Sequence, residues 1–329
     1  MAEAIEARKA HTDGPAVWPW KIYDACGIWF WVVVFALVFS RLSPYFLNYR
    51  NFSNIFRQAS IFAIMATGMT LVVISGGIDL SVGSVVSFTS AVLGVVWRDT
   101  ENIYLALAAA MAVGIVTGIA NGLLAGYCRM PPFIATFGLM SAGAGFAFAL
   151  TPSSIGDFPA WFEKLGNDRI RILSHAVPVP VIIMFAVAVV FMLFLDARRF
   201  GLRIFAVGGN ENGARMAGVN VPKLKLAIYT INGALASFAG IILCSRIRSS
   251  YPGIGLDMEM DVIASSVIGG ASLVGGEGRI FGAVGGAVFI CMIQNILNLM
   301  GVYPFMQKIV TGVFIVLAVF MNEFRSRRA

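Results

Sequence analysis

Long apolar runs recur along the whole chain and constrain it more than any other feature. Each run of about 18 to 25 residues, rising about 1.5 Å per residue as a helix, can cross a hydrocarbon core of about 30 Å. Charged residues are only 12% of the 329 residues and the mean hydropathy is +0.83, whereas a soluble domain carries roughly 25% charged residues. The sequence therefore predicts an all-α, polytopic membrane protein.

About ten transmembrane helices are predicted, with Gly-rich breaks inside 71–97 and 260–286. The predicted spans are 26–44, 54–75, 82–97, 102–126, 132–151, 178–196, 224–245, 260–273, 280–300 and 304–322. They form one transmembrane domain, 26–322, between an N-terminal segment, 1–25, and a short tail, 323–329. Segment 1–25 has no apolar core and so is not a cleavable signal peptide.

Basic residues in the gaps between the spans indicate orientation. Loop 197–223 and the residue before it carry Arg198, Arg199, Arg203, Arg215 and Lys223 against Asp196 and Glu211. Because cytoplasmic loops are enriched in Lys and Arg, this loop is predicted to be cytoplasmic, as are both termini. The long polar segments 152–177 and 246–261 then lie outside, either as solvated surface loops or as a docking surface for an extracytoplasmic partner.

Glycine spacing predicts close helix packing. Four glycines stand four residues apart and form a ridge along one helix: Gly114, Gly118, Gly122 and Gly126. Gly282 and Gly286 repeat the spacing. Small residues of this kind let neighbouring helices approach closely in lipid, so the pattern indicates a compact bundle and carries no information about a substrate.

Asp79 interrupts an apolar stretch directly after two glycines, Gly76 and Gly77. The glycines weaken helix continuity, and Asp79 and Ser81 are residue types that favour the start of a new helix. Irregular backbone within a membrane must be buried in protein or line an aqueous cavity. We therefore expect Asp79 to cap a helix or form a hinge, with contact to a solute as the alternative. A similar break at 267–282 contains Gly275 and Gly276, which with Gly76, Gly77 and Ser81 are the predicted hinge residues.

Neutral polar side chains within the spans are the other candidates for a translocation path. They are Asn121, Thr136, Asn232, Gln294, Asn295 and Asn298. Such side chains offer donors and acceptors to a polyhydroxyl solute without a fixed charge. The alternative is that they join neighbouring helices by hydrogen bonds. Gln294 and Asn298, four residues apart on one helix face, are the strongest path candidates of the late spans.

Enzymatic chemistry is not indicated. No His, Cys or carboxylate cluster offers a nucleophile or a metal site, so no catalytic residue and no metal ligand is predicted. The sequence contains no GxxxxGK[ST] phosphate-binding loop, so any ATP that drives this protein must be hydrolysed on another chain.

Three stretches carry a family resemblance: "MATGMTLVVISGGIDLSVGSV" at 65–85, the segment 206–242 that begins "AVGGNENGARMAGVNVP", and "IGGASLVGGEGRIFGAVGGA" with the "NILNLMGVYPFMQK" segment that follows it. Together they resemble membrane permeases of bacterial ATP-binding-cassette importers of the ribose type. The resemblance implies a type II-like importer permease in the bacterial inner membrane, which carries pentoses, hexoses, inositols or, in a sister group, nucleosides.

The resemblance also implies partners. A second copy of the permease or a paralogous permease completes one path across the lipid bilayer, an ATPase on the cytoplasmic side binds Mg-ATP, and a periplasmic or secreted binding protein delivers the solute. No cofactor bound directly by this chain and no nucleic acid is expected. The runner-up is an ion-coupled secondary transporter with Asp79 as its coupling site.

The resemblance gives loop 197–223 a role as the ATPase coupling segment. Glu211 and Arg215 stand four residues apart and so face one side of a short helix. The residues assigned to the coupling segment are Gly209, Asn210, Glu211, Ala214, Arg215, Ala217 and Gly218. Arg215 is expected at the contact, with Ala214, Met216 and Ala217 packing on the ATPase. The alternative is an ordinary solvated turn.

Overall fold

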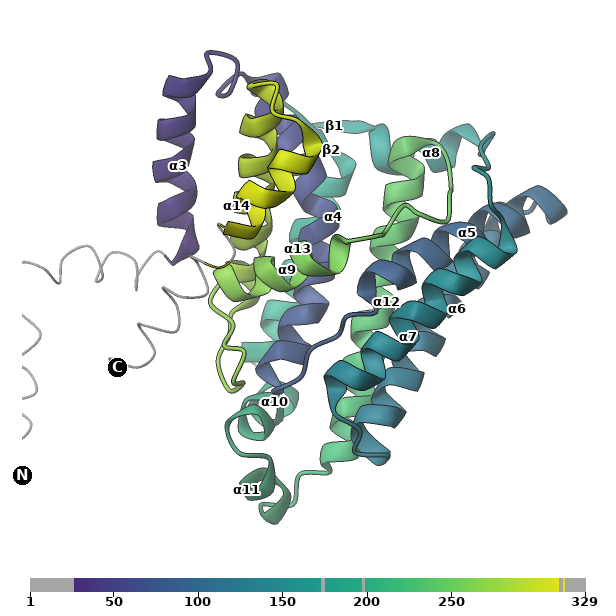
Figure 1. The fold of residues 1–329 in the computed structure, drawn as a ribbon, viewed down its shortest axis with the longest axis vertical. Helices are drawn as coiled ribbons and strands as arrows, with labels where there is room; N and C mark the ends of the chain where they lie inside the picture. Colours follow the sequence, from purple (N-terminus) through teal and green to yellow (C-terminus); the bar gives the residue numbers. More distant parts are fainter. Residues whose placement is uncertain (1–26, 173–174, 197–198, 314–315, 317–329) are drawn as a thin grey trace, which may run out of the picture.

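The computed structural model describes residues 27–172, 175–196, 199–313 and 316, and the described chain is helical apart from one short hairpin (Figure 1). The predicted N-terminal segment 1–25 and the predicted tail 323–329 lie outside these residues.

The first half of the described chain contains the helices α3 (Ile28–Leu42), α4 (Tyr49–Ile74), α5 (Val82–Thr100), α6 (Ile103–Gly122), the π-helical turn η2 (Leu123–Tyr127), α7 (Pro132–Leu150) and α8 (Ala160–Asn167). A hairpin of β1 (Arg169–Ile172) and β2 (His175–Pro178) follows. The second half contains α9 (Val179–Asp196), α10 (Arg199–Gly209), α11 (Glu211–Met216), α12 (Val221–Ile247), α13 (Met258–Ile268) and α14 (Ile280–Leu299).

Six helices of the described residues are long and apolar enough to cross a membrane: α4, α6 with η2, α7, α9, α12 and α14. The predicted count of about ten is not confirmed. The span predicted at 260–273 corresponds to α13, which has only 11 residues and therefore a length of about 16 Å. The first predicted span corresponds to α3, which has 15 residues, and the last, 304–322, extends outside the described residues.

The two loops that were predicted to lie on opposite sides of the membrane occupy opposite ends of the molecule. Helices α10 and α11 lie at one end, and α8 with the β1–β2 hairpin lies at the other (Figure 1). The hairpin is antiparallel, with Arg169 opposite Pro178. It was not predicted, although the alternating sequence Arg-Ile-Arg-Ile of β1 is a strand signal. Ile155 and Ser250 form a bridge between the two predicted external segments.

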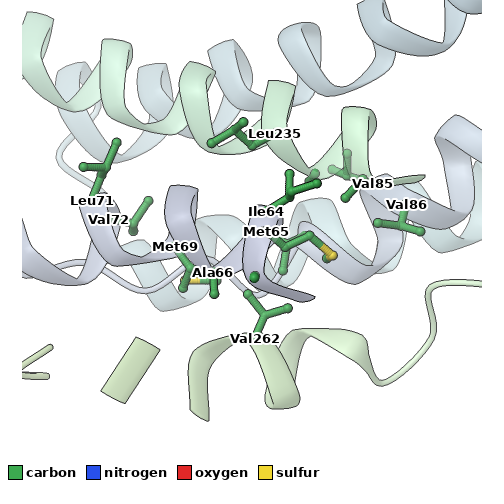
Figure 2. Close-up of a cluster of buried hydrophobic side chains, with 14 of the residues drawn as sticks. Ile64, Met65, Ala66, Met69, Leu71, Val72, Val85, Val86, Leu235 and Val262 are labelled. Carbon is green, nitrogen blue, oxygen red and sulfur yellow. The ribbon is translucent and has the colours of Figure 1, made fainter. Parts of the chain in front are cut away.

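Helix α4 forms the centre of the main apolar core. Its side chains Ile64, Met65 and Met69 are fully buried, and Figure 2 shows them between Leu235 of α12 and Val262 of α13. A second apolar cluster joins α3 to α14 and is rich in aromatic rings, with the ring centroids of Phe35 and Phe289 5.1 Å apart. The core is therefore built around one long helix whose surface is almost entirely covered by others.

The glycine ridge of α6 packs against α12, as the spacing predicted. A Cβ added at Gly118 would lie 2.7 Å from the Cα of Thr230, and one added at Gly122 would lie 2.6 Å from the Cα of Leu226. The complete antiparallel set of opposed positions is Gly114 with Gly233, Gly118 with Tyr229 and Thr230, Gly122 with Leu226, and Gly126 with Pro222. The ridge thus brings two backbones into direct contact along the length of α6, a close approach that side chains would prevent.

The second glycine pair behaves in the same way. Gly282 and Gly286 of α14 face the backbone of Gly269 and Ser265, at the end of α13. Both predictions of close packing are confirmed.

Candidate functional site

The break between α4 and α5 positions Asp79. Helix α4 ends at Ile74, Gly76 takes a left-handed conformation with φ of 78°, and the chain turns before α5 begins at Val82. Asp79 is 1% exposed. Its Oδ1 accepts a hydrogen bond from the backbone N–H of Ser81 at 2.9 Å and from the Ser81 hydroxyl at 2.6 Å.

These bonds correct the predicted capping. Ser81 is the N-cap of α5, but its side chain makes no capping hydrogen bond, and Asp79 binds the amide two residues on instead of an amide inside the helix. That geometry is an Asx turn, which Asp and Asn favour outside helices. Asp79 therefore shapes the break between α4 and α5, and its role as a hinge stays a prediction.

Two further helices donate hydrogen bonds at this break. Asn232 Nδ2 of α12 donates to Asp79 Oδ2 at 2.8 Å. Asn121 Nδ2 of α6 donates to the Ser81 hydroxyl at 2.8 Å and to Asp79 Oδ1 at 3.4 Å. We call Asp79, Ser81, Asn121 and Asn232 the Asp79 network. Among the described residues no Lys or Arg forms an ion pair with Asp79, and the donors that reach its carboxyl group are all neutral.

Thr136 connects α7 to the same break. Its hydroxyl accepts a hydrogen bond from the backbone N–H of Leu80 at 3.1 Å and donates to the carbonyl of Pro132 at 2.9 Å. Asp79, Asn121, Thr136 and Asn232, four of the path candidates, are thus brought together. All are buried in this conformation, so a solute could contact them only if the surrounding helices separate.

Three buried polar atoms at the Asp79 network have no hydrogen-bond partner among the described residues: Asn121 Oδ1, Asn232 Oδ1 and Tyr229 Oη. Buried polar groups are normally paired, with protein or with ordered water. Tyr229 lies three residues before Asn232 on α12, and a Cβ added at Gly77 would lie 2.6 Å from its hydroxyl. Tyr229 was missed in the sequence because an aromatic residue in an apolar span gives no local signal.

Two other predicted path residues, Gln294 and Asn295, belong to a separate polar seam between α4 and α14. Asn51 and Asn295 exchange amide hydrogen bonds at 2.9 Å in both directions. Gln294 accepts from Gln58 at 3.3 Å and donates to Asp261 at 3.1 Å. We call Asn51, Gln58, Gln294 and Asn295 the α4/α14 seam.

This seam lies far from Asp79 along α4. Gln58 precedes the end of α4 at Ile74 by 16 residues, which is about 24 Å of helix. Asn298, which was grouped with Gln294, is exposed and accepts a hydrogen bond from Gln307 at 2.9 Å. The set of path candidates therefore divides into two groups in the structure.

The predicted coupling segment contains two short helices, α10 and α11. Asn210 is the N-cap of α11 and its Oδ1 accepts from Gly213 N at 2.9 Å. Glu211 forms ion pairs with Arg215 at 2.9 Å, as the four-residue spacing predicted, and with Lys225 of α12 at 2.7 Å. The hydrogen bond and charge of Lys225 hold the pKa of Glu211 below its usual range.

The surface of this segment differs in one respect from the prediction. Ala214, expected to pack on the ATPase, is buried against the rest of this chain, because it lies on the inner face of α11. Met216 is 89% exposed, and Arg215, Ala217 and Gly218 are also exposed. Gly218 has φ of 85°, a conformation that favours glycine.

Comparison with known proteins finds one family. The sequence profile described as "Branched-chain amino acid transport system / permease component" matches residues 51–319. The chain is 40% identical over 300 residues to the ribose import permease protein RbsC of Escherichia coli (strain K12), covering 89% of this chain and 91% of that relative.

Other relatives match over a similar extent. The ribose import permease protein RbsC of Bacillus subtilis (strain 168) is 36% identical over 325 residues, 98% of this chain and 97% of the relative. The galactose/methyl galactoside import permease protein MglC of Haemophilus influenzae is 32% identical over 314 residues, 91% of this chain and 94% of the relative. No solved structure matches the chain.

Proposed function

Because the chain belongs to the transport-system permease family that includes these import permeases, we propose that it is the membrane subunit of an ATP-driven importer for a monosaccharide or similar polyhydroxyl solute. The observation that carries the proposal is the extent of the match, which runs from residue 51 to residue 319. It includes both Gly-rich breaks, the α6 ridge and the α10–α11 segment. A nucleoside is the alternative solute of the same proposal.

The proposal assigns ATP hydrolysis to another chain. No phosphate-binding loop occurs in the 329 residues, so Mg-ATP is expected on a cytoplasmic ATPase, and this chain binds no cofactor directly. A periplasmic or secreted binding protein delivers the solute to the face that carries α8 and the hairpin. Two permease copies, or this chain and a paralogue, enclose one path in a type II-like arrangement of about ten crossings each.

In this proposal Asp79, Asn121 and Thr136 contact the solute transiently. They are buried in the structure, so transport requires α6, α7 and α12 to move apart at the break. Neutral amides and hydroxyls suit a sugar, since they hydrogen-bond its hydroxyl groups without holding it by charge. Gln294, Asn295 and Asn298 remain path candidates of the α14 side.

The exposed surface of α11 is proposed to dock on the ATPase. Met216 is the sharpest test residue because it is 89% exposed, so its replacement leaves the bundle unchanged. Met216→Glu is expected to weaken co-purification of the ATPase, while the matched control Met216→Leu retains it. Arg215→Glu and Gly218→Asp are also expected to leave the permease inserted but to abolish uptake. Unchanged ATPase association in Met216→Glu and Arg215→Glu would overturn the docking assignment.

Orientation is tested by labelling single cysteines, after the native cysteines are removed. Ser154 lies in the predicted external segment and Asn212 lies in α11, and both are exposed. Ser154→Cys is expected to react with an impermeant thiol reagent in cells lacking the outer barrier, and Asn212→Cys is expected not to react. The reverse pattern would overturn the cytoplasmic assignment of both termini and of the ATPase contact.

Transport itself is tested in proteoliposomes that contain this chain, the ATPase and the binding protein. Uptake of a labelled pentose or hexose is expected to require ATP on the ATPase side and to continue when ion gradients are collapsed. Uptake that is driven by an ion gradient without ATP would favour the secondary transporter, in which Asp79 is the coupling site.

A further inference from the structure

Three segments that are far apart in the sequence meet through glycine backbones beside the coupling segment. They are the end of α4 with the first break (Ile74, Gly76), the end of α10 (Gly208) and the second break (Gly275, Gly276). We call these five residues the glycine junction. It lies where α10 approaches the lower end of α4 (Figure 1).

The contacts of the junction are between main-chain atoms. Gly276 N donates a hydrogen bond to the carbonyl of Ile74 at 2.8 Å. A Cβ added at Gly208 would collide with that same carbonyl oxygen and would lie 2.5 Å from Gly276 N. A Cβ added at Gly275 would lie 2.8 Å from Gly208 O and 3.0 Å from Gly76 Cα.

The backbone conformation at the junction also requires glycine. Gly76, Gly275 and Gly276 have φ of 78°, 95° and 78°, values that other residues rarely adopt. No side chain separates the three segments, so no rotamer change can absorb a displacement of one against another. Packed contacts of this kind shift between discrete arrangements and do not deform continuously.

Each break leads from the junction into the membrane bundle. The first continues through three residues to Asp79, whose hydrogen bonds reach α6 and α12. The second runs directly into α14, which begins at Ile280. Gly208 therefore contacts the backbones of two segments that lead into α5 and into α14.

A second connection between the coupling segment and the transmembrane helices runs from α11 to α12, and it includes a contact between flexible side chains. Helix α11 continues into α12 through residues 217–220, and the ion pair of Glu211 and Lys225 adds a contact between two long flexible side chains on a partly exposed surface. An ion pair of this type constrains its partners weakly. The backbone contacts of Gly208, by contrast, involve no flexible side chain.

We propose that the glycine junction transmits motion of the α10–α11 segment to both breaks, and that Gly208 is a positioning residue for transport. The proposal rests on the proposed function, because it assumes that the segment docks on an ATPase. Gly208 acts through Ile74 and Gly276 and touches neither solute nor ATP. A glycine outside both the junction and the coupling segment provides a contrast, because a Cβ at Gly145 of α7 would meet nothing within 4 Å.

The test compares Gly208→Ala with the control Gly145→Ala on α7 in the full complex of permease, ATPase and binding protein. Three quantities are measured: ATPase co-purification, ATP hydrolysis with and without loaded binding protein, and sugar uptake per ATP hydrolysed. Gly145→Ala is expected to match the wild type. Gly208→Ala is expected to retain the ATPase but to lose at least about tenfold in sugar uptake per ATP, a typical size for coupling between sites.

A second variant covers the case in which Gly208→Ala does not assemble. A Cβ added at Gly278 would meet side-chain atoms and no backbone, 2.6 Å from Ile74 Cγ1 and 3.3 Å from Ala271 Cβ, so Gly278→Ala perturbs the junction from the other break more mildly. It is expected to lower uptake per ATP in a complex of normal yield. Wild-type uptake per ATP in Gly208→Ala, or in Gly278→Ala where Gly208→Ala fails to assemble, would overturn the proposal.

A lowered yield of assembled complex with an unchanged sugar uptake per ATP would likewise assign the junction a purely structural role and overturn the proposal. The docking variants at Met216 test the proposed function separately, since they change ATPase association and leave the junction intact.

Discussion

The α6/α12 seam and the α4/α14 seam both join long apolar helices, but they do so with different groups. Between α6 and α12, glycines bring the two backbones together and the Asp79 network bonds to both helices. Between α4 and α14, paired amides such as Asn51 with Asn295 link side chains. The first seam has no freedom for a larger side chain, whereas the second is made of side chains that can adjust.

The comparison shows that the same type of polar residue can have different structural roles in different membrane helices. Asn121 and Asn295 are the same residue type in apolar helices, yet one donates toward a buried acid at a helix break and the other is half of a symmetrical pair. The first arrangement leaves unpaired polar atoms that a moving helix or a solute could use. The second satisfies its amides internally and stabilises a helix contact.

The strongest test of this contrast is a side chain added to the α6/α12 seam. Gly118→Val places a Cβ against the backbone of Tyr229 and Thr230, where nothing can rotate away. The cost of overpacking is commonly about 1 to 3 kcal/mol and rises when backbone must move, so we expect almost no folded protein in fluorescence-detected size exclusion. Gly138→Val on α7, where an added Cβ meets nothing within 4 Å, serves as the control and should fold normally. A normal profile for Gly118→Val would mean that the seam is looser than described.

The next test removes the acid at the end of that seam. Asp79→Leu leaves the donors of Ser81 and Asn232 without an acceptor, at about 1 to 3 kcal/mol for each unsatisfied buried group, while Asn121 keeps only its bond to the Ser81 hydroxyl. We expect a large fall in thermal stability in detergent. Asp79→Asn should lose much less, because its carbonyl replaces one oxygen and the free Asn232 Oδ1 can accept from its NH₂ after an amide flip.

Equal loss in Asp79→Leu and Asp79→Asn at normal protein levels would instead show that the negative charge is essential. In that case the difference between the two seams would be one of charge as well as of packing.

The α4/α14 seam should respond more mildly. In a double-mutant cycle of Asn51→Ala and Asn295→Ala we expect a coupling energy of about 0.6 kcal/mol, the average for such pairs within membranes. The measurement is reversible unfolding of the purified permease in mixed micelles. A coupling energy as large as that between Asp79 and Asn232 would remove the distinction between the seams.

The smallest effect is expected outside the membrane, at the ion pair of α11. Because the hydrogen bond and charge of Lys225 lower the folded-state pKa of Glu211, the contact stabilises the fold above the unfolded pKa of about 4.3 and is lost as pH falls through the lower folded value. Glu211→Gln should cost at most about 0.5 kcal/mol at pH 7, since the pair is partly exposed. The difference from wild type should vanish toward pH 3 in thermal unfolding scans, and a difference that grew on acidification would contradict the assigned sign.

Local patterns in the sequence predicted the breaks and the close packing but not the partners. Gly76 and Gly77 marked the end of α4, and the four-residue spacing marked the packing face of α6. The donors to Asp79 could not be found in this way, because Asn121 and Asn232 are 42 and 153 residues away from it. For the same reason Gln294 was grouped with Asp79. About 24 Å of α4 lies between Gln58, which bonds to Gln294, and the end of α4 that precedes Asp79.

Helix length was the other limit. The segment 260–273 has the composition of a span, but the chain needs residues on both sides of α13 to reach Ser87 of α5 and the glycine junction, so only 11 residues remain helical. The apolar pattern indicates that a segment is buried, and its tertiary contacts determine whether it also crosses the membrane.

The ridge on α6 has a consequence for how the protein is made. Helix α6 ends at Gly122 and its partner α12 begins at Val221, so the ribosome must add about 100 residues between them. At about 5 to 20 residues per second, the glycine ridge of α6 and the amide of Asn121 stay without their α12 partner for roughly 5 to 20 s. A nascent chain released in that interval would have the glycine face of α6 uncovered, which makes the arrival of α12 the step that closes this part of the bundle.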